Sequence, residues 1–339
     1  MIRNARHLVD ALREPETVLS LSGRDWTDLM SIARAESLLG SLAHRLSNIA
    51  VPQEVKPILK DAIQATDFAR LQALWEADCA RRALAPLKCK TVLMKGTAYV
   101  AADLDAAIGR NIGDLDIMVA HDRLSVVETA LLDAGWEWVK PDPYDDQYYR
   151  DYMHELPPLI HRERDRMIDV HHTILPLTAG PTPNATAILD AAVRLDSGLY
   201  VMAPPDMLLH SIAHLFADGD LAGGLRNLWD IDQLIRQFSS NEGFWTDLRS
   251  RAKTHQLEPH LARALRLATR LYDTPVRKNY TGQTRLTDHF YVRRLLARDG
   301  WGREKYKLTR LAFYIRSHWL RMPPLMLARH LWTKWRKGN

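Results

Sequence analysis

Hydrophobic positions repeat with a helical period at both ends of the chain and with a strand period in the middle. After Pro57, which suits the first turn of a helix, apolar residues follow the 3.6-residue period until Pro86. The same period predicts four later helices, over 206–217, 224–238, 242–256 and 258–272. Both ends of the chain are therefore expected to be helical.

The central segment has shorter apolar runs. Residues 90–95 contain the short apolar run 92–94 and lead into Gly96, as expected for a buried strand that feeds a tight turn. Residues 114–119 alternate strictly, which predicts a second strand. Other short stretches predict helices at 97–108 and 122–134, a strand at 136–139, and a β-hairpin whose strands are 154–161 and 167–174.

Two intervening segments lack such a period. Residues 141–151 are acidic and rich in Tyr, and they are expected to form a loop. Prolines mark 176–205 as a linker with one helix near 185–193. The chain is accordingly divided into an N-terminal helical region (1–86), a mixed α/β core (87–175), a C-terminal helical domain (176–275) and a tail (276–339), giving an α+β fold.

Charge separates the tail from the rest of the chain. Residues 276–339 contain 16 Lys and Arg but only 3 acidic residues, whereas the preceding residues contain 30 against 38. Aromatic residues alternate with basic ones between 301 and 337. A tail of this kind can contact an anionic membrane surface or nucleic acid, or it can pack on the acidic body of the protein.

Composition favours a cytoplasmic protein. Only two cysteines, Cys79 and Cys89, are present, and without neighbouring Cys or His they suggest free thiols in a reducing compartment. No apolar run approaches the roughly 20 residues of a membrane-spanning helix. If the tail binds lipid, the expected location is peripheral, at the inner face of the membrane.

Three aspartates are candidate metal ligands. On the predicted strand 114–119, Asp114 and Asp116 project to one face because side chains at i and i+2 point the same way. Asp169 lies on a later predicted strand and shares its face with His171. Carboxylate oxygens are ligands that Mg²⁺ prefers. The pattern therefore predicts a Mg²⁺ or Mn²⁺ site formed by these three residues.

A candidate phosphate-binding turn precedes the aspartates. Lys95, Gly96 and Thr97 lie where a predicted strand meets a predicted helix, so the turn offers a close backbone approach, a hydroxyl and a positive charge. Alone, an Asp-x-Asp strand is also typical of a solvated polar face, and a Lys-Gly-Thr turn is ordinary. Their order along the chain makes the combination much more specific.

The order of these motifs resembles the polymerase-beta-like nucleotidyltransferase superfamily. The segments 93–97, Arg110 and 113–119 more closely resemble a bacterial nucleotidyltransferase family with a Leu-Lys-Gly, Arg and Asp-x-Asp signature. The later segments 168–171, 206–214 and 225–232 also fit that family, so the resemblance covers about residues 25–275. It implies a nucleotidyltransferase core at 87–175.

By matched position, the resemblance implies that the three aspartates bind metal and that Gly96 and Thr97 hold a triphosphate. Lys95, Gly113, Arg110 and His171 are further candidates for binding the nucleotide. The expected reaction is Mg²⁺-dependent transfer of a nucleoside monophosphate, AMP from ATP, to an acceptor hydroxyl or phosphate, with release of pyrophosphate. The acceptor can be a small molecule or a macromolecule. The alternative is a non-catalytic nucleotide- or polyanion-binding module that retains the fold.

Several residues have two interpretations each. Arg110 can contact the triphosphate or neutralise the aspartates. His171 can orient a metal-bound carboxylate, shuttle a proton or make a structural hydrogen bond. For His210 and His214, spaced i, i+4, a packing or capping role is favoured over metal binding. Asp230 belongs to a second Asp-x-Asp segment, but in a helical pattern where i and i+2 diverge.

Overall fold

The computed structural model describes residues 5–140, 142–321 and 332. The parts of the predicted tail at 322–331 and 333–339 lie outside the described residues. The N-terminal helical prediction is confirmed, and the long helix α4 carries Pro57 in its first turn. The elements of this region are α1 Arg6–Arg13, η1 Pro15–Ser20, α2 Gly23–Ala35, α3 Leu39–Arg45, α4 Lys56–Leu84 and η2 Ala85–Leu87.

The described residues form a mixed seven-stranded sheet with the order β3-β4-β5-β2-β1-β7-β6. The central pair, β2 and β5, is parallel, and β1 runs antiparallel to β2. The predicted hairpin is confirmed, because β4 and β5 pair antiparallel. The strands are β1 Val92–Leu93, β2 Leu115–Met118, β3 Trp136–Trp138, β4 Leu159–His161, β5 Met167–His171, β6 Val193–Arg194 and β7 Tyr200–Val201.

Helices cover the sheet and continue the chain beyond it. Within the core these are α5 Lys95–Ala101, η3 Asp105–Ala107, η4 His121–Arg123, α6 Leu124–Asp133 and α7 Pro143–Tyr152. Those that follow are α8 Ala185–Ala191, α9 Pro204–Ala213, the π-helical turn η5 His214–Asp218, α10 Gly224–Phe238, α11 Phe244–Thr254, α12 Glu258–Tyr272, α13 Lys278–Thr281, α14 Thr287–Leu295 and α15 Lys307–Arg321. No described helix is long and apolar enough to cross a bilayer.

Two predictions from local sequence were wrong. The segment 141–151, expected to be a loop, contains helix α7, which begins at Pro143 because proline is tolerated in a first helical turn. The linker 176–205 contains α8 as expected, but it also contributes β6 and β7. Because β7 pairs in parallel with β1, the sheet extends past residue 175, the predicted end of the core. The boundaries of the four predicted regions stay predictions.

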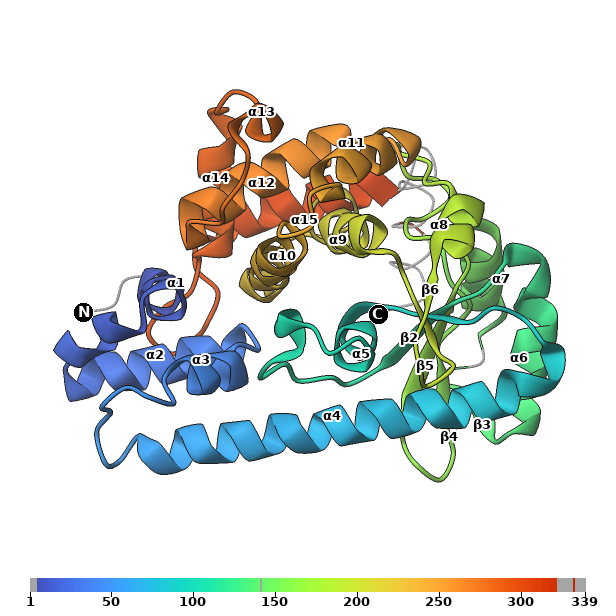
Figure 1. The fold of residues 1–339 in the computed structure, drawn as a ribbon, viewed down its shortest axis with the longest axis horizontal. Coiled ribbons are helices and arrows are strands. Elements are labelled where there is room, and N and C mark those ends of the chain that lie inside the picture. The colour runs from blue at the N-terminus through green and yellow to red at the C-terminus, as the bar shows by residue number, and fades with distance from the viewer. Residues whose placement is uncertain (1–4, 141, 322–331, 333–339) are drawn as a thin grey trace.

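One hydrophobic cluster joins these layers. It extends from Ala5 in the N-terminal helices to Phe313 in α15 and includes the buried faces of β1, β2 and β5. In Figure 1 the long helix α4 runs along one side of the molecule, beneath α5, and the C-terminal helices lie on the opposite side. The candidate site lies between these layers, at the sheet edge where β1 ends and β2 begins. The α+β fold class is confirmed.

Candidate active site

The sheet brings the three predicted aspartates together. Asp116 on β2 and Asp169 on β5 are direct partners in the parallel register, and Asp114 comes immediately before β2. One carboxylate oxygen from each residue lies within 4.8 Å of the others, so the trio could hold a metal ion. Adjacent parallel strands thus place side chains from distant parts of the sequence side by side.

Asp116 is the buried member of the trio, with 2% of its surface exposed. Lys95 Nζ lies 2.5 Å from its Oδ1, and His171 Nε2 lies 2.9 Å from the same oxygen. Burial alone would raise the pKa of Asp116, but the Lys95 charge and the His171 contact outweigh it and hold that pKa well below its usual range. Asp116 is therefore ionised, with both contacts on one oxygen.

The pKa of Asp169 is shifted in the opposite direction from that of Asp116. Burial, followed by the negative charges of Asp116 and Glu155, raises the pKa of Asp169 to about 7. Oxygen ligands crowded in this way fit a hard divalent cation, whose charge would offset their mutual repulsion. The donor set therefore suits Mg²⁺ or Mn²⁺ better than a soft metal, which favours sulfur ligands.

The predicted phosphate-binding turn lies beside the trio. Lys95 opens α5 with a left-handed φ of +47°, and this conformation turns the chain sharply after β1. A Cβ on Gly96 would come within 2.7 Å of Arg110 Nε, so a larger residue would displace that guanidinium. The Thr97 hydroxyl is buried and has no hydrogen-bond partner among the described residues. Thr97, Gly113 and Asp114 line one small depression.

Arg110 has a different partner from those expected. Its guanidinium forms an ion pair with Asp230 on α10 and lies 5.5 Å from the Tyr99 ring centroid. Arg226 also binds Asp230, through a hydrogen bond of 3.0 Å from Nε. Asp230 therefore links α10 to the mixed α/β core. The two roles predicted for Arg110, triphosphate contact and neutralisation of the trio, both stay predictions.

Residues that the sequence analysis did not single out complete the surroundings. Glu155 Oε2 lies 3.3 Å from His171 Nδ1 and 3.8 Å from His154 Nε2. His171 thus lies between two carboxylates: its Nε2 is hydrogen-bonded to Asp116, whereas its buried Nδ1 approaches Glu155 without forming a hydrogen bond among the described residues. The adjacent pair His154-Glu155 could have been noticed in the sequence, because histidine and glutamate side chains commonly bind metals or transfer protons. Its approach to His171 depends on an isolated bridge between residues 155 and 171, which no local pattern indicates.

The two histidines of α9 and η5 differ in their surroundings. Burial, reinforced by the positive charge of Lys95, holds the pKa of His210 well below its usual value, so this imidazole is neutral. His214 Nδ1 lies 3.0 Å from the Asn227 amide nitrogen. His210 is buried, as expected for a packed side chain, whereas His214 is exposed.

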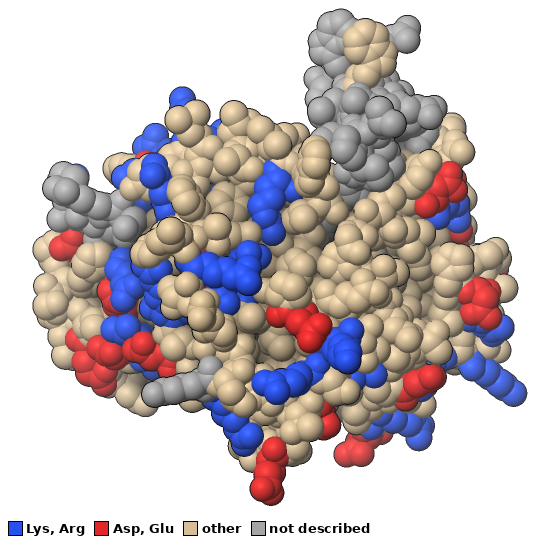
Figure 2. Space-filling view, turned by 90° about the horizontal axis from the view of Figure 1, so that it is seen from above, with Lys and Arg blue, Asp and Glu red and all other residues tan. Residues whose placement is uncertain are grey.

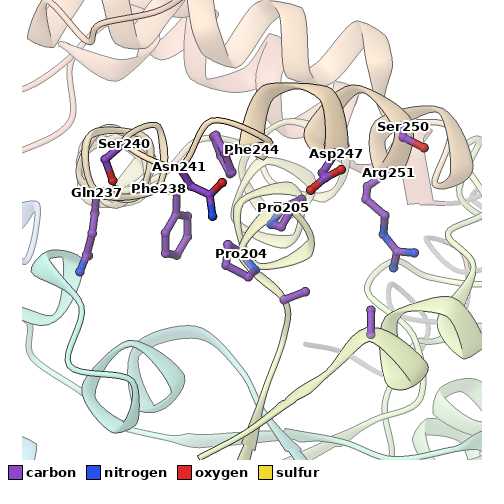
Figure 3. A pocket seen from close by; sticks show the side chains of 12 residues that line it. Pro204, Pro205, Gln237, Phe238, Ser240, Asn241, Phe244, Asp247, Ser250 and Arg251 are labelled. Atoms are coloured by element: carbon purple, nitrogen blue, oxygen red, sulfur yellow. Dashed lines mark hydrogen bonds between the residues drawn. The ribbon is translucent and has the colours of Figure 1, made fainter.

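Two cavities lie away from the trio. One, of about 430 Å³, is bounded by α9, α10 and α11, with Pro204, Phe238 and Arg251 in its wall (Figure 3). The other, of about 490 Å³, lies beyond the opposite end of β2 and β5, next to His121 and His172. None of the three aspartates lines either cavity.

Comparison with known proteins identifies the family of the chain. The profile of a family described as uncharacterised nucleotidyltransferase matches residues 22–273. No curated protein matches the sequence. A solved structure of an antigenic nucleotidyltransferase-like protein from Paracoccidioides brasiliensis has 14% identity and a TM-score of 0.29, over 62% of this chain and 96% of that one. Because the family profile spans most of the chain and all three aspartates, the chain belongs to the uncharacterised nucleotidyltransferase family.

Proposed function

We propose that this protein transfers a nucleoside monophosphate from an NTP, ATP being the expected donor, to an acceptor hydroxyl or phosphate, and that it requires Mg²⁺ or Mn²⁺. The observation that carries this proposal is the convergence of Asp114, Asp116 and Asp169 within 4.8 Å. Membership of a nucleotidyltransferase family supports the reaction class.

In the proposed reaction the acceptor oxygen attacks the α-phosphorus of the NTP. A bond forms between that oxygen and the phosphorus, the bond from the phosphorus to the bridging oxygen breaks, and pyrophosphate leaves. The acceptor proton passes to a base or to water. When bound by Asp114, Asp116 and Asp169, a divalent cation would neutralise phosphate charge and lower the pKa of the attacking hydroxyl.

The chain's own residues would bind and orient the reactants. Thr97, whose hydroxyl is buried and unpaired among the described residues, is placed to donate to a phosphate oxygen. Lys95 supplies positive charge beside the turn. His171, buried beside Glu155, is hydrogen-bonded to Asp116 and would so fix the orientation of that carboxylate. These are the positioning roles that in-line phosphoryl chemistry requires.

The experiment follows the label of the donor. The protein is incubated with Mg²⁺ and ATP labelled at the α- or the γ-phosphate, together with small-molecule, RNA and protein fractions of its source cells. We expect the α-label, and not the γ-label, to enter one fraction while pyrophosphate is released. Transfer of the γ-label would contradict nucleotidyl transfer. Absence of both transfer and metal-dependent ATP binding would favour the non-catalytic module.

The fraction that takes the label identifies the class of acceptor. Asp116→Asn serves as the matched control, because it keeps the shape of the side chain while removing the charge. We expect it to lower the transfer rate by about a thousandfold, as is typical when a ligand of an essential ion is lost. If the acceptor is RNA, transfer should also fall steeply as salt rises, whereas a small-molecule acceptor would show no such slope.

A further inference from the structure

Helix α15 presents an apolar stripe to solvent. Leu308, Leu311, Ile315 and Trp319 have between 52% and 83% of their surface exposed. Their spacing of i, i+3, i+7 and i+11 places them on one side of the helix. A surface helix of a globular protein normally shows polar residues to water, so the outward face of α15 has the opposite character from that expected.

The other face of α15 is firmly attached to the protein. Phe313 is buried, and its ring lies 5.1 Å from that of Tyr291 on α14. Arg316 donates a hydrogen bond of 2.5 Å to the Phe216 carbonyl in η5, and Ser317 is buried beside them. The helix is therefore packed on its polar-aromatic side, which leaves the apolar stripe directed outward.

Positive charge accompanies this stripe. Lys307 and Arg310, on the same helix, are exposed. From Lys305 to Asn339 the sequence contains nine Lys and Arg and no acidic residue. On the side of the molecule formed by the C-terminal helices, Lys and Arg side chains gather over one half of the face (Figure 2). An apolar stripe beside such a charge matches a surface that is apolar beneath and anionic outside.

We propose that α15 is an in-plane membrane-binding helix that docks the protein on an anionic bilayer. Its aliphatic and tryptophan side chains enter the boundary between head groups and acyl chains, and the neighbouring Lys and Arg contact anionic head groups. The docked helix stays joined to the body through Phe313 and Arg316. This proposal does not depend on the reaction proposed above.

Charge and side-chain type favour the bilayer over two other occupants. A second copy of the chain would bring two strongly basic segments together, and like charges repel. Single-stranded nucleic acid binds by stacking its bases on aromatic rings, whereas Leu308, Leu311 and Ile315 are aliphatic. A bilayer satisfies both the aliphatic stripe and the positive charge.

The test measures co-sedimentation of the full chain with vesicles of phosphatidylcholine alone, or with about a third phosphatidylglycerol. We expect binding to the anionic vesicles, weaker binding in high salt, and little binding to the neutral ones. The double variant Leu311→Asp/Ile315→Asp should lower the partition coefficient by about a hundredfold, because two apolar side chains are lost to the interface.

A matched control comes from another exposed apolar pair. Phe68 and Leu71 on α4 are 61% and 67% exposed, one helical turn apart. Phe68→Asp/Leu71→Asp should leave vesicle binding unchanged. The proposal would be overturned if the native protein failed to bind anionic vesicles, if both double variants bound equally well, or if sedimentation equilibrium showed a dimer that only the α15 variant loses. Unchanged melting temperatures would show that both variants fold.

Discussion

Two Asp-x-Asp segments in this protein have opposite surroundings. Asp114 and Asp116 lie at the start of a strand and converge with Asp169, so three carboxylates share one small volume. Asp230 and Asp232 lie on helix α10, where side chains two residues apart diverge by about 200°. Asp230 accordingly binds Arg110 and Arg226, while Asp232 binds Arg236.

The period of the backbone therefore determines whether the two carboxylates of an Asp-x-Asp segment lie together or apart. On the strand, the carboxylates repel one another, and this unfavourable arrangement suits a bound cation. On the helix, each carboxylate is matched by arginine, and the pair between Asp230 and Arg110 ties α10 to the core. We therefore expect substitutions in the strand segment to affect metal binding and activity, and those in the helix segment to affect stability.

The largest effect on stability is expected from Asp230→Ala. The substitution leaves Arg110 and Arg226 charged, largely buried and without their shared partner. Breaking a buried pair in this way costs about 3–5 kcal/mol, which urea denaturation would measure. Asp67→Ala, at an exposed position on α4, is the control and should change the free energy of unfolding by less than about 0.5 kcal/mol. If the two substitutions lowered the free energy of unfolding equally, the stabilising role of the Asp230 ion pairs would be contradicted.

A second prediction concerns the pH dependence that Asp169 contributes to the metal-free protein. Its pKa rises from 3.8 to about 7, so between these pH values the folded state keeps a proton that the unfolded chain releases. The protonated Asp169 side chain therefore stabilises the folded state fully below about pH 4, and this stabilisation is lost as the pH rises through about 7. We expect a loss of about 2 kcal/mol, less than the full shift implies because Asp169 is partly exposed.

Chemical denaturation of the native protein and Asp169→Asn in EDTA, at pH 5 and pH 8, isolates this contribution. All other titratable groups are the same in the two proteins, so their contributions to the pH dependence cancel in the difference. The native protein should lose more stability than the variant between the two pH values. If the free energy of unfolding changed equally in the two proteins between pH 5 and pH 8, the raised pKa of Asp169 would be contradicted.

A smaller effect is expected from Asp232→Ala. Asp232 is buried, but its ion-pair partner Arg236 is 41% exposed and can be hydrated once the carboxylate is removed. The remaining costs are the lost hydrogen bonds of 2.6 Å from Thr274 and 2.8 Å from Gln233, which make a destabilisation of about 1–2 kcal/mol the expected result of thermal or urea denaturation. A loss as large as that of Asp230→Ala would show that exposure of the arginine does not matter.

The smallest change in stability is expected from Asp114→Asn. Asp114 is exposed, so loss of its charge should alter the free energy of unfolding by no more than about 0.5 kcal/mol. The same variant should still lose metal-dependent nucleotide binding, measured by calorimetry. A destabilised variant with normal nucleotide binding would reverse the contrast between the strand and helix segments.

Long periodic segments were predictable from the sequence. Helices 224–238 and 258–272 were predicted with the bounds that α10 and α12 have, because their apolar period is continuous. The two-residue strands β6 and β7 are too short to show a period. They form because β7 pairs with β1 and β6 pairs with β7. Helix α7 was missed because its acidic residues and proline are also typical of loops.

Within the site, the sequence predicted the residues better than their partners. Strand alternation and motif order brought Asp114, Asp116 and Asp169 into consideration, and the structure places them together. The ion pair of Arg110 joins residues 120 positions apart, and no local pattern specifies such a contact. The approach of Glu155 to His171 likewise depends on how the chain enters the sheet edge.

The most direct test of the central claim is calorimetric titration with Mn²⁺ and a non-hydrolysable ATP analogue. The trio variants Asp114→Asn, Asp116→Asn and Asp169→Asn are compared with Asp232→Asn, an aspartate of the helix segment. We predict that each trio variant weakens Mn²⁺-dependent binding by about a hundredfold or more, while Asp232→Asn binds like the native protein. Native affinity in all three trio variants would contradict the assignment of the metal site.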